Sequence, residues 1–289
     1  MKQPVFEGVA TALVTPFKNG TVDYTMLEQL LDFQLAGGVD AIVICGTTGE
    51  ASTMSPQEQL GTIAHAIKYT AGRCKIIAGT GSNNTAHCLE MSRVADSMGA
   101  GALLLVTPYY NKCTQAGLVR HYTTVADTVR CPVIVYNVPS RTGVEISVDT
   151  LAELSRHPNI NGVKEAGGNT AKVARTIERC GDDLFVWSGN DDQTVPLMAL
   201  GAKGVISVLS NVRPKQTLEM TRACQEGRYA DAGKLQCRLM PLIDALFCEV
   251  NPIPVKQALK LIGFDAGEPR LPLTPLSASH EELLKKLLT

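Results

Sequence analysis

Eight short apolar segments, separated by longer stretches of helical pattern, constrain the fold of this 289-residue chain more than any other feature. They are Gly8–Val14, Ala41–Cys45, Lys75–Ala78, Ala102–Thr107, Pro132–Asn137, Ile160–Lys164, Leu184–Ser188 and Lys203–Leu209. Most of them are apolar at every position, which is typical of parallel strands that helices cover on the outside. The pattern therefore predicts a sheet that is buried on both faces.

The stretches between these segments carry helix signals. Ser55-Pro56-Gln57-Glu58 predicts a helix start, with Ser55 as N-cap, proline in the first turn and Glu58 completing a capping box. Eight successive strand–helix units predict one closed α/β barrel, a (β/α)8 TIM barrel. An open doubly wound sheet is the alternative, but no Gly-x-Gly-x-x-Gly follows the first strand, where a dinucleotide fold would carry one.

The pattern changes after residue 227. Tyr229–Phe247, Pro252–Ile262 and Ser279–Leu288 read as helices with no strand between them. We therefore expect a catalytic barrel over residues 1–227 and a C-terminal domain, a three-helix appendage, over residues 228–289.

Charge and composition exclude several classes of partner. The net charge of -1 gives no basic surface for nucleic acid or an anionic membrane. No apolar run approaches the roughly 20 residues of a membrane helix. Residues 1–7 carry a proline and an acid where a signal peptide needs its apolar stretch, and the nine cysteines include no Cys-x-x-Cys. We expect a soluble, cytoplasmic protein with reduced thiols.

The site of such a barrel lies at the carboxyl ends of its strands. These ends are rich in hydroxyls and glycines and carry none of the five histidines. The sequence also lacks a His-Glu-x-x-His, a Cys/His set with ligand spacing and a Gly-x-Ser-x-Gly. It therefore predicts neither a metal site nor a serine or cysteine triad, and leaves lysine chemistry with tyrosine and threonine as proton carriers.

Lys164 ends the sixth predicted strand. Because side chains alternate across a strand, Lys164 and Glu165 should point to opposite sides. A lysine inside the barrel mouth would be partly desolvated, which favours the neutral amine that can form an imine with a ketone. The alternative is a lysine whose ammonium reaches solvent at the rim without a catalytic task.

Three other features of the rim each allow a functional and a purely structural interpretation. Tyr136 could carry protons or only fill the core, and Thr47-Thr48 could hold a carboxylate on backbone amides or form a plain turn. Arg141 could clamp a carboxylate through its forked guanidinium or lie on the surface. Their common location on one rim favours a functional site.

Five motifs in order together resemble the dihydrodipicolinate synthase family of pyruvate aldolases across essentially the whole chain. They lie at 46–50, 107–110, 136–143, 162–165 and 251–256. The resemblance implies condensation of pyruvate with L-aspartate-4-semialdehyde to 4-hydroxy-tetrahydrodipicolinate, the first committed step toward diaminopimelate and lysine. It implies no cofactor, because the lysine amine takes that role.

The resemblance also assigns roles to individual residues. It implies an imine on Lys164 and a proton relay of Tyr136, Thr47 and Tyr110, with Tyr110 reaching the site of a neighbouring subunit. The substrate-binding positions that it implies are Thr48, Arg141, Gly189 and Ile206. The assembly that it implies is a homotetramer built from two tight dimers.

One departure from the family concerns feedback inhibition by lysine, which some members bind at the tight dimer interface. Asn83 and Tyr109 are retained, but Pro56 and Gln59 replace two histidines and His87 replaces a glutamate. Because the ligand's ammonium loses its carboxylate partner, we expect weak or absent inhibition by lysine.

Two rival functions stay open from the sequence. N-acetylneuraminate lyase or a 2-keto-3-deoxy sugar-acid aldolase would share Lys164 and Tyr136, although Arg141 favours a short substrate with its own carboxylate. A non-catalytic keto-acid-binding barrel would have no need of both an imine-forming amine and a proton relay.

Overall fold

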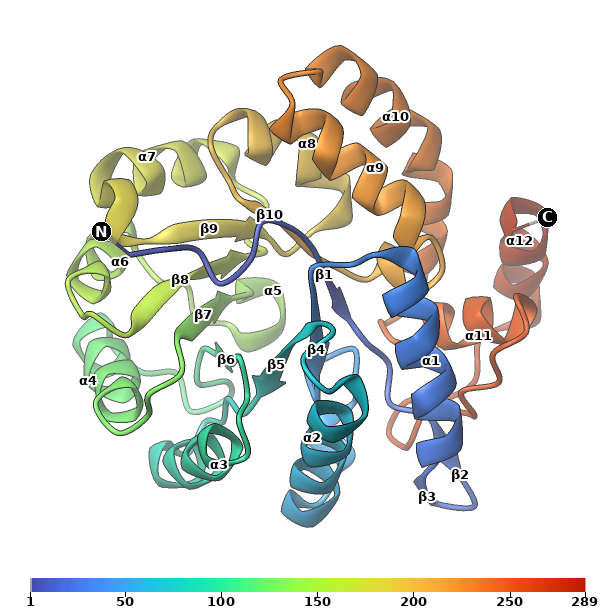
Figure 1. The fold of residues 1–289 in the computed structure, drawn as a ribbon, viewed down its shortest axis with the longest axis horizontal. Coiled ribbons are helices and arrows are strands. Elements are labelled where there is room, and N and C mark those ends of the chain that lie inside the picture. The colour runs from blue at the N-terminus through green and yellow to red at the C-terminus, as the bar shows by residue number, and fades with distance from the viewer. Residues whose placement is uncertain (1, 289) are drawn as a thin grey trace.

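The computed structural model describes residues 2–288 and closes the eight predicted strands into a parallel barrel (Figure 1). The barrel strands are β1 (Gly8–Ala12), β4 (Ala41–Ile44), β5 (Lys75–Gly79), β6 (Ala102–Val106), β7 (Val133–Asn137), β8 (Ile160–Glu165), β9 (Phe185–Ser188) and β10 (Gly204–Ser207). Each strand pairs with its neighbour in this order, and β10 pairs with β1. The closed barrel is confirmed, and the open-sheet alternative is wrong.

Helices surround the barrel (Figure 1). They are α1 (Tyr24–Gly37), α2 (Pro56–Thr70), α3 (Thr85–Ser97), α4 (Gln115–Ala126), α5 (Pro139–Thr142), α6 (Val148–Ser155), α7 (Thr170–Cys180), α8 (Thr194–Ala199) and α9 (Pro214–Gln225), followed by α10 (Tyr229–Leu246), α11 (Ile253–Leu261) and α12 (Ala278–Leu288). A small hairpin, β2 (Phe17–Lys18) and β3 (Thr21–Val22), and four single 3₁₀ turns, η1 (Ala51–Thr53), η2 (Gly181–Asp183), η3 (Asp191–Gln193) and η4 (Leu209–Asn211), complete the fold.

The start of α2 is formed as the sequence predicts. The Ser55 hydroxyl accepts the Glu58 N–H at 3.2 Å, and the Glu58 carboxylate accepts the Ser55 N–H at 2.9 Å. This capping box satisfies two amides that a helix start leaves without partners.

Two predicted strands end earlier than expected because side chains replace the sheet's backbone partners. Val14 donates its N–H to the Asn211 side chain at 3.2 Å, so β1 stops at Ala12. The N–H groups of Val208 and Leu209 both bond to the Asp191 carboxylate at 2.9 Å, which turns the chain out of β10 into η4.

The N-terminal segment closes one end of the barrel. Phe6 stacks on Trp187 with ring centroids 5.1 Å apart, and the Trp187 indole N–H donates to the Phe6 carbonyl at 3.2 Å. Both side chains belong to the buried apolar cluster inside the barrel. Because Phe6 lies just before β1, the filled end is the amino-terminal end of the strands, and the carboxyl ends stay accessible.

The three predicted C-terminal helices are confirmed as α10, α11 and α12. The first of them, α10, packs against α8 and α9 of the barrel wall, and α12 packs against α10 and α11 (Figure 1). The division of the chain at residue 227 stays a prediction. Within residues 2–288, no helix is both long and apolar enough to span a membrane.

Candidate active site

Lys164 lies inside the barrel mouth. The register of β7 and β8 places it beside Tyr136, and the side chain is 5% exposed with its Nζ 4.3 Å from the centroid of the Tyr136 ring. Glu165 takes the opposite direction, where its carboxylate accepts from the Asn137 amide at 2.8 and 2.9 Å and lies 3.3 Å from the Lys172 amine. The predicted alternation holds, and the alternative of a lysine reaching solvent is wrong.

The surroundings of Lys164 favour the neutral amine. Burial lowers the pKa of Lys164 from 10.5 to about 8; the Asp191 carboxylate opposes this shift and the Arg141 guanidinium adds to it. Within residues 2–288, no group accepts a hydrogen bond from the Lys164 amine. With that pKa, roughly a tenth of Lys164 is unprotonated at pH 7, far more than for an exposed lysine.

Tyr136 stays a phenol at neutral pH. Burial raises its pKa to about 12, although Arg141 and a side-chain hydrogen bond with Thr47 act in the opposite direction. A protonated hydroxyl linked to a second hydroxyl can pass protons in either direction. The structure thus brings together Lys164, Tyr136 and Thr47.

The turn that carries Thr47 and Thr48 is held by the C-terminal helices. The Asn251 amide donates to the Thr48 hydroxyl at 2.9 Å. The Glu50 carboxylate accepts from the Lys256 amine at 2.8 Å, and each of these two side chains is 2% exposed. These contacts join residues more than 200 positions apart and hold the turn against α11 and the residues just before it.

Sequence reasoning missed this support. Asn251 and Lys256 belong to the motif at 251–256 and Glu50 to the motif at 46–50, but the sequence does not predict their contacts. The available signal was charge: Glu50 follows a glycine-rich turn and Lys256 lies among apolar residues, which makes each a candidate for a buried partner.

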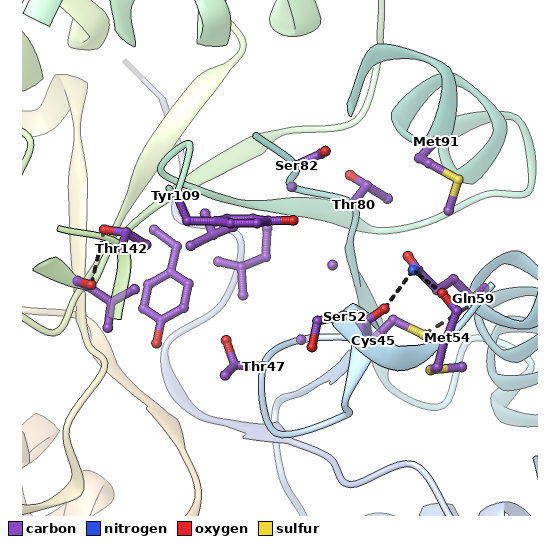
Figure 2. A pocket seen from close by; sticks show the side chains of 18 of the residues that line it. Cys45, Thr47, Ser52, Met54, Gln59, Thr80, Ser82, Met91, Tyr109 and Thr142 are labelled. Atoms are coloured by element: carbon purple, nitrogen blue, oxygen red, sulfur yellow. Dashed lines mark hydrogen bonds between the residues drawn. The ribbon is translucent and has the colours of Figure 1, made fainter. Parts of the chain in front are cut away.

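A cavity of about 450 Å³ opens beside these residues. Thr47, Tyr136, Arg141 and Gln59 line it. The other polar or sulfur-bearing side chains of its wall are Cys45, Ser52, Met54, Thr80, Ser82, His87, Met91, Tyr109 and Thr142. Figure 2 shows Thr142 on one side of Tyr109, and Gln59 with Met91 on the other. The cavity thus extends from the amine's neighbours toward α2 and α3.

The other predicted substrate-binding residues differ in their exposure and in how they approach the cavity and Lys164. Arg141 is exposed, lines the cavity and donates to the Asn251 carbonyl at 3.5 Å. Gly189 is so close that a Cβ there would come within 3.1 Å of Lys164 Cε. Ile206 is fully buried in β10, and its side chain belongs to the interior cluster.

Tyr110 does not join this group. Its side chain is 90% exposed, its φ is +70°, and it does not line the cavity, whereas the preceding Tyr109 does. Its predicted place in a neighbouring subunit's site stays a prediction. Within residues 2–288, no cluster of three or more His, Cys, Asp or Glu side chains could hold a metal ion.

Comparison with known proteins identifies the family. The sequence matches the Dihydrodipicolinate synthetase family over residues 5–289. A relative from Caldicellulosiruptor saccharolyticus, named 4-hydroxy-tetrahydrodipicolinate synthase, is 50% identical over 99% of this chain and 97% of its own length. The chain belongs to the dihydrodipicolinate synthetase family. The predicted resemblance is confirmed.

Solved structures of dihydrodipicolinate synthases have the same fold. The chloride-inhibited enzyme from Acinetobacter baumannii, in complex with pyruvate, gives a TM-score of 0.96 at 43% identity and 98% coverage of both chains. A synthase described as the first monomeric variant gives 0.96 at 42% identity, with 98% of this chain and 96% of that chain covered. The likeness includes the C-terminal helices as well as the barrel.

Proposed function

We propose that Lys164 is the amine through which this chain carries out the dihydrodipicolinate synthase reaction, the condensation of pyruvate with L-aspartate-4-semialdehyde. The observation that carries the proposal is a buried lysine in the barrel mouth that lies beside a phenol and has no hydrogen-bond acceptor among residues 2–288. Such a lysine is poised to attack a carbonyl carbon.

The neutral Lys164 amine adds to the keto carbon of pyruvate and forms a carbinolamine. Tyr136, with Thr47 behind it, moves the protons that let the carbinolamine lose water, which leaves a positively charged imine. That nitrogen withdraws electrons, so a methyl proton of the pyruvate unit can leave and an enamine forms. The enamine carbon attacks the aldehyde of the second substrate, and the substrate's own amine displaces Lys164 as the ring closes.

Substrate carboxylates require fixed donors. We assign the pyruvate carboxylate to Thr48 and its backbone N–H, and the carboxylate of the semialdehyde to Arg141. Asn251 supports both assignments, because it bonds to the Thr48 hydroxyl and to the Arg141 guanidinium. Gly189 and the Ile206 carbonyl line the imine, and the missing side chain at Gly189 leaves room for it.

The complete site requires a second subunit in this proposal. Tyr110 supplies the third hydroxyl of the proton relay to a neighbour's site, in a cytoplasmic homotetramer of two tight dimers. The Tyr110 side chain is 90% exposed and its φ is +70°, so it projects into solvent, where a partner subunit could contact it. Light scattering of the wild-type protein tests the assembly, and the turnover of Tyr110→Phe, once its assembly is shown to be unchanged, tests the relay.

Substrate selectivity tests the function. With pyruvate and L-aspartate-4-semialdehyde the protein should turn over, whereas N-acetylneuraminate and 2-keto-3-deoxy sugar acids should not be cleaved. Arg141→Ala should raise KM for the semialdehyde by about 10- to 100-fold and leave KM for pyruvate nearly unchanged. Efficient cleavage of a sugar acid would favour the aldolase alternative, and pyruvate binding without any turnover would favour a binding protein.

A further inference from the structure

Asp191 is a buried carboxylate that the reaction above does not use. It is the first residue of η3, directly after β9, and is 2% exposed. Its Oδ2 accepts the N–H groups of Val208 and Leu209, each at 2.9 Å. Its Oδ1 is buried and has no hydrogen-bond partner among residues 2–288. A buried charged oxygen without a partner is costly unless a positive charge lies nearby.

Lys164 carries the positive charge that acts on Asp191. The strand end that leads to Asp191 runs along the lysine side chain, since a Cβ at Gly189 would lie 3.1 Å from Lys164 Cε. The charges of Lys164 and Asp191 act on each other: the carboxylate favours the protonated amine, and the amine favours the carboxylate. The other charged group that acts on Lys164 is Arg141, which is positive.

Asp191 is held rigidly. The Gln236 amide of α10 donates to the Asp191 carbonyl at 2.9 Å, and the Gln236 side-chain oxygen accepts the Val195 N–H at 3.2 Å. Burial is the largest influence and leaves the pKa of Asp191 above its ordinary value, while the Ser207 hydroxyl, the two backbone N–H groups and the charge of Lys164 act in the opposite direction and favour the carboxylate. The carboxylate therefore has a fixed position before any substrate arrives.

We propose that Asp191 is a positioning residue that acts through Lys164, as the fixed counter-charge of the positive imine nitrogen that this lysine forms with pyruvate. The inference rests on the proposed function. The charge on the nitrogen persists from ammonium to imine, in a site where little water can solvate it. A preorganised carboxylate stabilises that charge without reorganisation, and Asp191 neither takes nor gives a proton.

Asp191→Asn tests this role with little disturbance. The asparagine side-chain oxygen can accept both backbone N–H groups, as Oδ2 does, and its amide takes the place of the oxygen that has no partner. We expect kcat to fall on the order of 10- to 100-fold. We also expect the acid limb of kcat/KM for pyruvate to move to lower pH by about one unit, because the lysine loses the charge that favours its protonated form.

Asp192→Asn is the matched control. Asp192 is exposed, adjacent in sequence and does not act on Lys164, so its variant should keep the wild-type pH profile. If kcat/KM of Asp191→Asn falls by the same factor at every pH and its acid limb stays at the wild-type pH, Asp191 has only a structural role and the proposal is overturned. Asp191→Ser, which also removes the charge, serves if the asparagine variant does not fold, and failure of both to fold would equally overturn it.

Borohydride reduction separates this inference from the proposed function. If wild-type protein is not labelled on Lys164 by pyruvate and borohydride, the proposed function fails. If wild type is labelled and Asp191→Asn forms the adduct at the wild-type rate with an unchanged pH dependence, only the role of Asp191 fails.

Discussion

Two lysines are almost equally buried in this protein, and their surroundings differ completely. Lys164 in the barrel mouth is 5% exposed and Lys256 in α11 is 3% exposed, and burial is the main cause that lowers the pKa of each. The Lys256 amine donates to the Glu50 carboxylate at 2.8 Å and to the carbonyls of Thr15 and Glu268 at 3.2 and 3.3 Å. The Lys164 amine has no acceptor among residues 2–288.

The difference suits the two lysines to different tasks. Lys256 keeps its proton because three acceptors replace water, so it serves as a structural cation that fixes the turn before α2. Lys164 has the Asp191 carboxylate as a counter-charge but no hydrogen-bond acceptor among residues 2–288, so its ammonium form is less stable than that of Lys256 at the point where the proposed reaction needs a neutral amine. The predictions below test this contrast, beginning with the largest effect.

Replacement of Lys164 should remove catalysis. Lys164→Met should lower kcat/KM for the condensation by at least about a thousandfold, because no lysine among residues 2–288 lines the cavity and could replace it. Lys203→Met is the control, since this half-exposed lysine lies just before β10 with its amine 3.6 Å from Glu7 and should keep wild-type turnover. A decrease in kcat/KM of less than tenfold in Lys164→Met would contradict a catalytic role for Lys164 and remove its contrast with Lys256.

Replacement of Lys256 should instead lower the free energy of unfolding. Lys256→Met leaves Glu50 buried without its partner, and we expect a loss of about 3–5 kcal/mol in the free energy of unfolding. Denaturant titration measures it. The double variant Glu50→Gln, Lys256→Met should recover part of the loss, and a loss below about 1 kcal/mol in the single variant would contradict the structural role.

Lys164→Met should have the opposite effect on stability at pH 7, a gain of about 1–3 kcal/mol. The folded pKa of about 8 lies below the ordinary 10.5, so the unfolded state binds more protons between these values. Wild-type stability therefore rises with pH from about 8 to 10.5, and the advantage of the variant should shrink there. A variant that is less stable at pH 7, or a difference in stability that does not change with pH, would argue against an amine whose charge Asp191 compensates only in part.

Tyr136→Phe tests whether the phenol moves protons. Without the hydroxyl, kcat should fall by about 10²- to 10⁴-fold while KM for pyruvate changes little. Tyr122→Phe is a suitable control, because Tyr122 is fully buried and its hydroxyl has no hydrogen-bond partner among residues 2–288. Equal losses in the two variants would indicate a packing defect and not a relay.

The smallest expected effect is that of added lysine. A bound lysine would need a carboxylate for its ammonium, as Lys256 has in Glu50, but the cavity presents His87 and Gln59 at the relevant positions. The Gln59 amide already donates to the carbonyls of Ala51 and Met54 at 2.8 and 3.2 Å. Millimolar lysine should leave the initial rate unchanged, and inhibition at sub-millimolar lysine would prove this expectation wrong.

The barrel and the position of Lys164 inside its mouth could be predicted from the sequence because both depend on local patterns. Apolar segments define the strands, and alternation along β8 places Lys164 and Glu165 on opposite sides. Contacts that depend on three-dimensional closure could not be predicted. Glu50 and Lys256 are 206 residues apart, and no periodicity links them.

Asp191 shows the same limit within the predicted site. The sequence places it at the end of the seventh predicted strand, on the rim, but only the structure shows that one of its oxygens is buried without a partner. A rim carboxylate is ordinarily solvated, and its sequence neighbours Asn190 and Asp192 give no sign of a difference. For Tyr110 the limit lies in the structure, because its predicted role requires a neighbouring subunit and the structure contains a single chain.

Borohydride reduction in the presence of pyruvate, followed by peptide mapping, tests the central claim most directly. The account predicts one stable adduct, on the peptide that contains Lys164, formed faster as pH rises toward 8 and absent from Lys164→Met. An adduct on Lys256 or another lysine, or full condensation activity without any adduct on Lys164, would contradict it.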